Sequence, residues 1–129
     1  MKLAFIMDPI EEVNIERDST FFIMLAAIKR DYEVWYCTPE NMWAENNNVF
    51  AKLTRVTVEK KNPHYEIISK ETKNLADFNA VFMRKDPPFN MEYINSTYLL
   101  SMLKGKTFLV NDPDGIRTAN EKVFILNFP

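Results

Sequence analysis

Residues 80–89 read AVFMRKDPPF, a short apolar run followed by a charged turn that contains two prolines. The apolar run 80–83 is bounded and composed like a buried strand. After the turn, Asn90 is a favourable helix cap, so a helix is expected to begin near Met91. We therefore predict a strand-to-helix turn, which in open α/β sheets lies at the carboxyl ends of the strands, where ligands bind.

The charged residues of this turn suit a polar ligand. Arg84 carries a planar guanidinium that matches a carboxylate or a phosphate, and Asp86 can receive an ammonium group. The two prolines restrict the backbone, so the turn is expected to be stiff. The alternative, which sequence statistics alone favour, is a rigid turn whose charges are only solvated. Arg84 and Asp86 are therefore candidate ligand-binding residues.

The composition is typical of one globular domain. Hydrophobic residues make up 47% of the 129 residues and aromatic residues 13%, which is enough for a packed core. The net charge of −2 and the lack of a long basic run give no sign of nucleic-acid binding. No apolar run is long enough to span a membrane, and the chain starts with a strand pattern instead of a signal peptide.

Low counts of three residue types exclude several kinds of site. A single Cys and a single His exclude an intrachain disulfide and a Cys/His zinc site, and a reducing, cytoplasmic location is expected. The two glycines, Gly105 and Gly115, fit neither the G-x-x-x-x-G-K nor the G-x-G-x-x-G pattern. The domain is therefore not expected to hold phosphates in a glycine-rich loop of its own.

Apolar runs alternate with helix-like segments along most of the chain. This alternation predicts an α/β domain with a Rossmann-like, mainly parallel sheet flanked by helices. Strands are expected over 3–7, 33–38, 80–83, 107–110 and 123–126, and helices over 19–30, 91–103 and 114–119. The residues predicted to face the sheet are Phe21, Leu25 and Ile28, with Phe22 and Ala26 alongside, in the first helix and Ile94, Tyr98 and Met102 in the second.

Residues 39–72 interrupt the alternation of strands and helices. The Asn-rich stretch 45–48 predicts a β-hairpin turn between two apolar segments. The apolar alternation then changes phase, which predicts a bulge near Thr54 and Arg55. A further short strand is expected over 65–69. We expect this inserted hairpin to lie against the core in the place of a crossover helix.

Polar or reactive residues elsewhere in the chain have simple structural explanations. Asp8 ends the first strand, and either Asp18 or Ser19 can cap the first helix, so a strand stop and a helix cap are the simplest roles of Asp8 and Ser19. Their shared position at a strand's carboxyl end keeps a ligand-binding role open for both. Cys37 has no visible base or cation to lower its pKa, so it is expected to be a core residue. His64 is expected to be solvated in a loop, with no assigned role.

The end of the chain is strongly apolar over 123–128 and stops at Pro129. Because the termini of a finished domain usually lie in solvent, this pattern indicates a chain that ends at a linker. The expected organisation is an α/β domain over 1–119, with 120–129 as the start of a linker to a domain absent from this sequence.

Three motifs together resemble the amino-terminal domain of bacterial glutathione synthetases. They occur in the family's order and span nearly the whole chain. The motifs are Met7-Asp8-Pro9-Ile10 with Asn14-Ile15 and Asp18-Ser19; Met83-Arg84-Lys85-Asp86-Pro87-Pro88-Phe89; and Asn111-x-Pro113-x-x-x-Arg117-x-x-Asn120-Glu121-Lys122. The second motif is highly specific, whereas the Asp-Pro-Ile start is weak without it.

The resemblance implies the pre-ATP-grasp domain of an ATP-dependent ligase. Such enzymes use ATP and Mg²⁺ to convert the cysteinyl carboxylate of γ-glutamylcysteine into an acyl phosphate, which the amine of glycine then attacks. They act mainly by positioning the reactants and by neutralising charge on the transferring phosphoryl group. In the family a following ATP-grasp domain supplies most of the nucleotide and metal ligands, and the enzymes assemble as homo-oligomers partly through this domain.

Carried over by position, the resemblance makes Arg84 the ligand of the dipeptide carboxylate and Lys122 a nucleotide-contacting residue. Asp86, Asp8 and Ser19 remain further candidates for substrate binding. No catalytic or metal-binding residue is expected within this chain. Because the ATP-grasp domain is absent from the 129 residues, the isolated chain is expected to have no ligase activity and no tightly bound cofactor.

Two other functions remain open on the sequence. The chain can be the leading domain of a different ATP-grasp ligase, although the motif from Met83 to Phe89 counts against this. It can also be a stand-alone α/β binding or interaction module that docks through its apolar segment 123–128.

Overall fold

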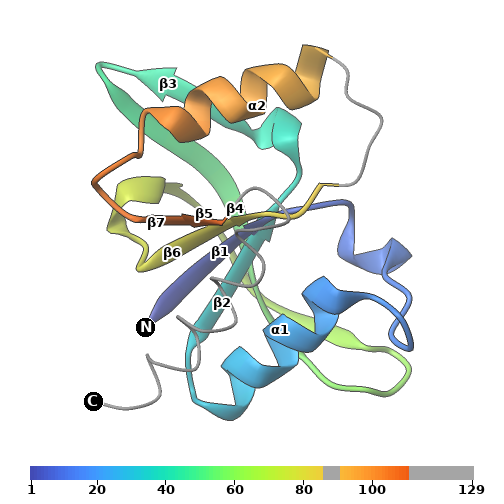
Figure 1. Ribbon diagram of the computed structural model, residues 1–129. Coiled ribbons are helices and arrows are strands. Elements are labelled where there is room, and N and C mark those ends of the chain that lie inside the picture. The colour runs from blue at the N-terminus through green and yellow to red at the C-terminus, as the bar shows by residue number, and fades with distance from the viewer. Residues whose placement is uncertain (86–90, 111–129) are drawn as a thin grey trace.

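The computed structural model describes residues 1–85 and 91–110. The strands are β1 (Lys2–Ile6), β2 (Glu33–Cys37), β3 (Met42–Glu45), β4 (Asn48–Val58), β5 (Tyr65–Asn74), β6 (Ala80–Met83) and β7 (Phe108–Val110). The helices are α1 (Ser19–Lys29) and α2 (Met91–Ser101), with short 3₁₀ helices at Ile10–Glu12, Pro39–Asn41 and Leu75–Asp77. Figure 1 shows β1, β6 and β7 between the two α-helices.

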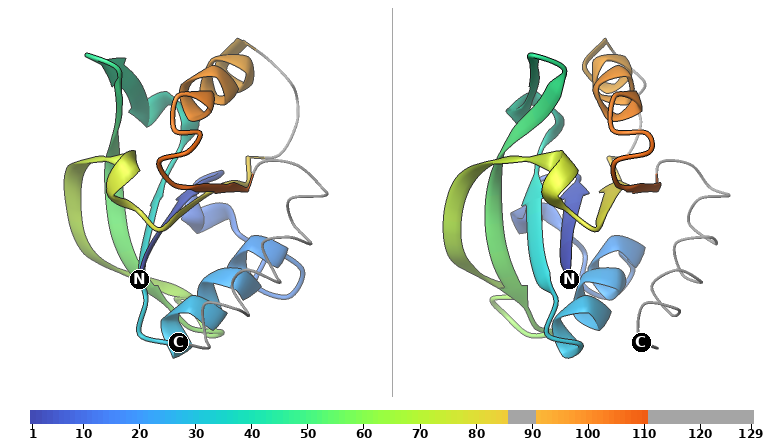
Figure 2. Two further views of the ribbon diagram at one scale, coloured as in Figure 1. Left: turned by 60° about the vertical axis from the view of Figure 1, so that its left-hand side comes forward. Right: turned by 90° about the vertical axis from the view of Figure 1, so that its left-hand side faces the viewer.

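The parallel part of the sheet has the predicted β-α-β pattern. Its strand order is β2-β1-β6-β7, with parallel pairing at each step. The helix α1 connects β1 to β2, and α2 lies between β6 and β7 along the chain. Successive residues of β1 contact opposite faces, because Leu3 and Phe5 pack with α1 whereas Ala4 and Ile6 share a core with α2. The helices therefore cover opposite faces of the sheet, as Figure 2 shows.

The prediction of a mainly parallel sheet is wrong. Beside the three parallel pairings, the described strands form three antiparallel ones, which join β4 to β2, β3 and β5. Two turns reverse the chain, one at 59–64 between β4 and β5 and one at the predicted hairpin, where Asn46 and Asn47 have φ angles of 51° and 66°. This left-handed pair reverses the chain in two residues, so β4 returns antiparallel and joins the sheet instead of lying against it. The sheet is therefore mixed.

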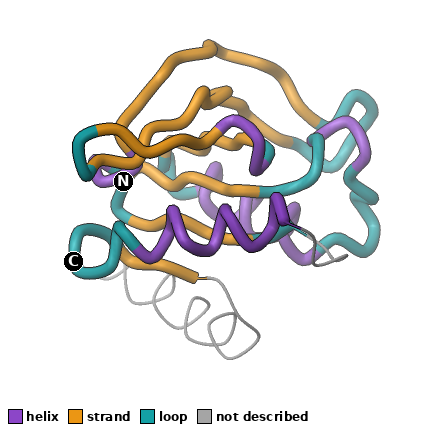
Figure 3. Tube along the Cα trace, turned by 90° about the horizontal axis from the view of Figure 1, so that it is seen from above, coloured by secondary structure: helices purple, strands orange, loops and turns teal. Residues whose placement is uncertain are grey.

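The long strands β4 and β5 give the sheet its curl, which Figure 3 shows from above. One edge of β4 pairs first with β3 and then with β2, while β5 runs along the other edge. The β4–β5 register shifts between Arg55 and Val56, which confirms the predicted bulge. The strand β5 extends to Asn74, beyond the predicted 65–69. Its second half is polar and carries no apolar alternation, so the sequence pattern did not indicate a strand there.

The predicted buried faces of the two helices are confirmed only in part. Phe21 is fully buried, and Leu25 and Ile28 pack against the same core. On α1 the sheet-facing residues include Met24 and Ala27, while Phe22 is 42% exposed. On α2, Tyr98 is 70% exposed and Leu100 is buried. The segment 21–28 is apolar on every side, so its periodicity does not distinguish the face that packs on the sheet.

Several predictions lie outside the described residues. They concern the helix 114–119, the strand 123–126, the division of the chain at 119 and the candidates Asp86 and Lys122. Among the described helices, none combines the length and apolar character that crossing a membrane requires.

Candidate functional site

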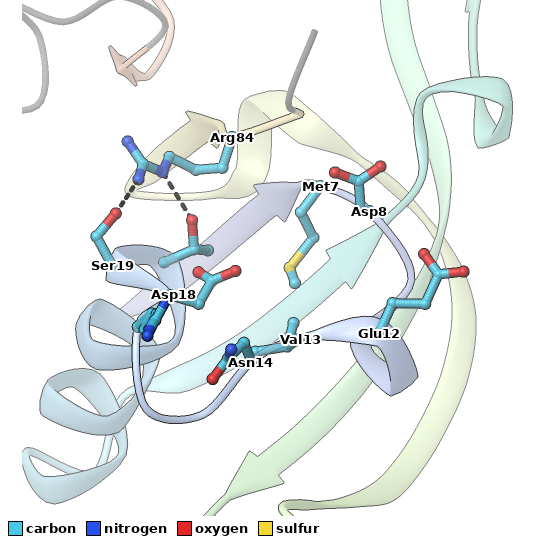
Figure 4. Close-up of a pocket in the computed structure, with 10 residues that line it drawn as sticks. Met7, Asp8, Glu12, Val13, Asn14, Asp18, Ser19 and Arg84 are labelled. Carbon is cyan, nitrogen blue, oxygen red and sulfur yellow. Dashed lines mark hydrogen bonds between the residues drawn. The ribbon is translucent and has the colours of Figure 1, made fainter.

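A pocket of about 410 Å³ lies where β1 and β6 end. These strands are parallel neighbours, with Ile6 opposite Met83, so their carboxyl ends meet at the same sheet edge. From β1 the chain continues to α1 on one face, and the helix that follows β6 covers the other face. Ligands of open α/β sheets bind at such a reversal of strand order. Residues lining the pocket are Met7, Asp8, Glu12, Val13, Asn14, Arg17, Asp18, Ser19, Thr20 and Arg84 (Figure 4).

Both the backbone and the side chain of Arg84 are held in place. Its backbone N–H donates to the carbonyl of Ile6 at 2.7 Å, which extends the β1–β6 pairing by one step. Its Nε donates to Thr20 Oγ1 at 2.8 Å, and its Nη2 donates to Ser19 Oγ. Because two hydroxyl groups accept from one guanidinium, the planar cation has a defined orientation at the start of α1.

The first turn of α1 adds a second source of positive potential. The carboxylate of Asp18 caps the helix by accepting from the backbone N–H of Phe21 at 3.1 Å, so Asp18, and not Ser19, is the cap of the two that the sequence allows. The helix has 11 residues, so its N-terminal N–H groups carry the partial positive charge of the helix dipole. Together with the Arg84 cation, this end of the pocket suits a carboxylate or another anion.

Carboxylates lie at the other side of the pocket. Figure 4 shows Asp8 and Glu12 across from Arg84 and Ser19. Asp8 forms an ion pair with Lys85, in which Oδ1 and Nζ are 2.8 Å apart and both side chains are partly buried. The pocket therefore combines the Arg84 cation with several carboxylates, including Asp18 at the start of α1, and such a mixture of charges complements a zwitterionic, amino-acid-like ligand.

The structure brings together three of the sequence candidates, Asp8, Ser19 and Arg84, in this pocket. The sequence did not indicate Thr20, which is 5% exposed and accepts the hydrogen bond from Arg84 Nε. The available signal was the pair of hydroxyl residues directly after the Asp18 cap. It was overlooked because one capping residue already accounted for the helix start.

Two further expectations concern metals and thiol chemistry. Within residues 1–85 and 91–110, no three His, Cys, Asp or Glu side chains are arranged to hold a metal ion. Burial raises the pKa of the Cys37 thiol from 9.0 to about 12, and the nearby charge of Glu40 adds to the rise. The thiol is therefore protonated at neutral pH, which agrees with the prediction that Cys37 is a core residue.

Comparison with known proteins identifies the family. Residues 1–117 match the family described as prokaryotic glutathione synthetase, N-terminal domain. Glutathione synthetase of Vibrio vulnificus is 41% identical over 132 residues, covering 100% of this chain and 41% of the relative. The Bradyrhizobium diazoefficiens protein is 38% identical, covering 100% and 41%, and the Escherichia coli protein 39%, covering 96% and 40%.

The chain spans about 40% of the length of these relatives, so the comparison concerns one part of the longer proteins. Within that part, the match extends over nearly every described element, from β1 through β7. The chain therefore belongs to the N-terminal domain family of prokaryotic glutathione synthetases.

Proposed function

We propose that this chain is the substrate-side domain of a glutathione synthetase, a ligase that joins γ-glutamylcysteine to glycine. ATP, held with Mg²⁺ mainly by a following ATP-grasp domain, supplies the phosphoryl group that activates the cysteinyl carboxylate. The observation that carries the proposal is the family match over residues 1–117, and the Arg84 pocket at the strand ends supports it.

Further features follow from the same proposal. Residues 1–119 form the substrate-side domain, and 120–129 begin the linker to the ATP-grasp domain. The complete enzyme is a homo-oligomer in the cytoplasm, where the free, buried Cys37 fits a reducing environment. The isolated chain has no ligase activity, because most nucleotide and metal ligands belong to the other domain.

In this proposal Arg84 binds the carboxylate of the dipeptide. The hydroxyls of Ser19 and Thr20 hold its guanidinium before the substrate arrives, which lowers the ordering cost of binding. Ser19 can also donate its own hydroxyl hydrogen to the substrate, and the carboxylate of Asp8, which pairs with Lys85, accepts the ammonium group of the dipeptide. From the resemblance, Asp86 adds a second carboxylate and Lys122 contacts the nucleotide.

The test is the substitution Arg84→Ala in the complete enzyme encoded by the source gene, with phosphate release measured against dipeptide concentration. Losing a bidentate carboxylate contact costs on the order of 2–3 kcal/mol, or roughly 30- to 150-fold in kcat/KM for the dipeptide. The matched control is Arg30→Ala at the other end of α1, where Arg30 donates to the carbonyl of Ala26.

An unchanged dipeptide KM and kcat in Arg84→Ala would refute the assigned role. Sequencing the reading frame beyond Pro129 tests the wider proposal. A following domain with a glycine-rich loop and clustered Glu and Asn metal ligands supports the ligase. A stop codon after Pro129 favours a stand-alone binding module instead.

A further inference from the structure

The turn between β4 and β5, residues 59–64, contacts the segment 10–18, part of which lines the pocket. Its last residue, His64, contacts the carbonyl oxygen of Ile10, with Nε2 and the oxygen 2.6 Å apart. A carbonyl can only accept, so Nε2 carries a hydrogen and donates it. Ile10 is fully buried and lies 54 residues earlier in the sequence. The predicted loop position of His64 is correct, but the expectation of a solvated side chain is wrong, because the imidazole is partly buried and hydrogen-bonded.

The imidazole of His64 also packs against α1. Its ring is edge-on to Phe21, with ring centroids 5.8 Å apart, and edge-on to Tyr65 at 5.0 Å. Phe21 is fully buried and lies directly after the two residues whose hydroxyls hold Arg84. One side chain therefore contacts both the segment after β1 and the helix, and both line the pocket.

The segment from Ile10 to Asp18 pairs with none of the described strands. Apolar packing of Ile10, Val13 and Ile15 against the core beneath α1 holds it, together with the contact of His64. The backbone hydrogen bonds found along it are local, for example from Glu12 N to Pro9 O and from Asp18 N to Asn14 O. Its residues Glu12, Val13 and Asn14 line the pocket. Local hydrogen bonds set the shape of the segment but not its place relative to α1.

A second contact from the same turn is weaker. Lys60 Nζ lies 3.4 Å from Glu16 Oε2, and the two side chains are 49% and 68% exposed. Exposed ion pairs of this kind contribute little to stability. The hydrogen bond of His64 is short and its acceptor belongs to a buried residue, so His64 is the stronger of the two contacts.

We propose that His64 is a positioning residue for the substrate pocket. It fixes the segment 10–18 relative to α1, and it thereby sets the distance between the carboxylate side of the pocket and Arg84. The inference rests on the proposed function, because it assumes that the dipeptide binds in this pocket. His64 does not line the pocket itself.

The experiment compares His64→Asn with His64→Gln in the complete enzyme. The Asn amide is too short to reach the Ile10 carbonyl, whereas the Gln amide nitrogen takes the place of Nε2. In His64→Asn we expect a rise of about 5-fold in the KM for γ-glutamylcysteine, with kcat changed less than about twofold, as for one average hydrogen bond. His64→Gln restores KM to within about twofold of the wild type.

A matched control and a second measurement separate positioning from general loss of stability. Lys61→Ala changes the same turn and removes only an exposed ion pair with Glu59, so KM should not change. Hydrogen exchange of the amides in 10–18 should be faster in His64→Asn than in Lys61→Ala, at a temperature where both variants are folded.

The outcomes distinguish this inference from the proposed function. If Arg84→Ala raises the dipeptide KM but His64→Asn leaves it unchanged, His64 does not position the pocket and the ligase proposal stands. If neither variant changes KM, the assigned dipeptide site is wrong, and hydrogen exchange of the 10–18 amides then decides whether His64 holds this segment. Faster exchange in His64→Asn supports His64 as the contact that holds this segment, and unchanged exchange overturns it.

Discussion

The hydrogen bond between Arg84 and Thr20 allows a sharp test of the site, because a nearly isosteric change removes it. Thr20→Val replaces the hydroxyl that accepts from Arg84 Nε at 2.8 Å with a methyl group. A hydrogen bond to a charged group contributes about 1.5–3 kcal/mol. Arg84 is only partly buried, so we expect a loss at or just below the lower end of this range, about 1–1.5 kcal/mol of unfolding free energy.

The same change should weaken substrate binding. With Thr20→Val, Ser19 is the remaining hydroxyl partner of the Arg84 guanidinium shown in Figure 4, so the fork loses its defined orientation. Re-orienting it on binding costs about 1 kcal/mol, which corresponds to a roughly 5-fold higher KM for γ-glutamylcysteine. The assay is phosphate release by the complete enzyme against dipeptide concentration, with denaturant unfolding of the same variant.

The control for this prediction is Thr20→Ser, which keeps the hydroxyl and removes only the methyl group. Its dipeptide KM should stay within about twofold of the wild type. A folded Thr20→Val enzyme with an unchanged KM would refute the reasoning. Equal impairment in both variants would also contradict it, because Thr20→Ser keeps the hydroxyl that accepts from Arg84.

Two predictions concern the core. Phe82→Ala removes a fully buried ring that stacks on Phe5 with centroids 4.7 Å apart, so denaturant unfolding should show a loss of about 3–5 kcal/mol; a loss no larger than that of exposed Phe22→Ala would contradict the assigned core. The raised pKa of Cys37 predicts that a thiol reagent labels the chain at pH 8 only after unfolding. Its contribution to stability should be fully present below pH 9 and should decrease toward pH 12, because above pH 9 the unfolded thiol ionises first.

Much of the fold follows from local sequence. The apolar runs that form most of β1 and all of β6 are strands as predicted, because buried strands of parallel sheets are continuously apolar. The helix start at Asp18 and the two-residue turn at Asn46 and Asn47 also follow from local chemistry. In each case the residues that form the feature are neighbours in the chain.

The candidate site was predictable only in part. The position of Arg84 at the end of a strand, and its suitability for a carboxylate, were visible in the sequence. Its partner Thr20 lies 64 residues away, and no local pattern links the two. The contact between His64 and Ile10 is likewise remote, so a lone loop histidine gave no sign of it.

The amino-acid sequence alone was sufficient for the apolar strands, the hairpin turn, a choice between two helix caps and the family resemblance, because each depends on short-range residue patterns. The packed chain was needed for the antiparallel pairing of β4 with β2, for the buried faces of α1 and α2, and for the contacts of Arg84 and His64. Backbone propensities are local, whereas the choice among strand partners and helix faces minimises the free energy of the whole molecule.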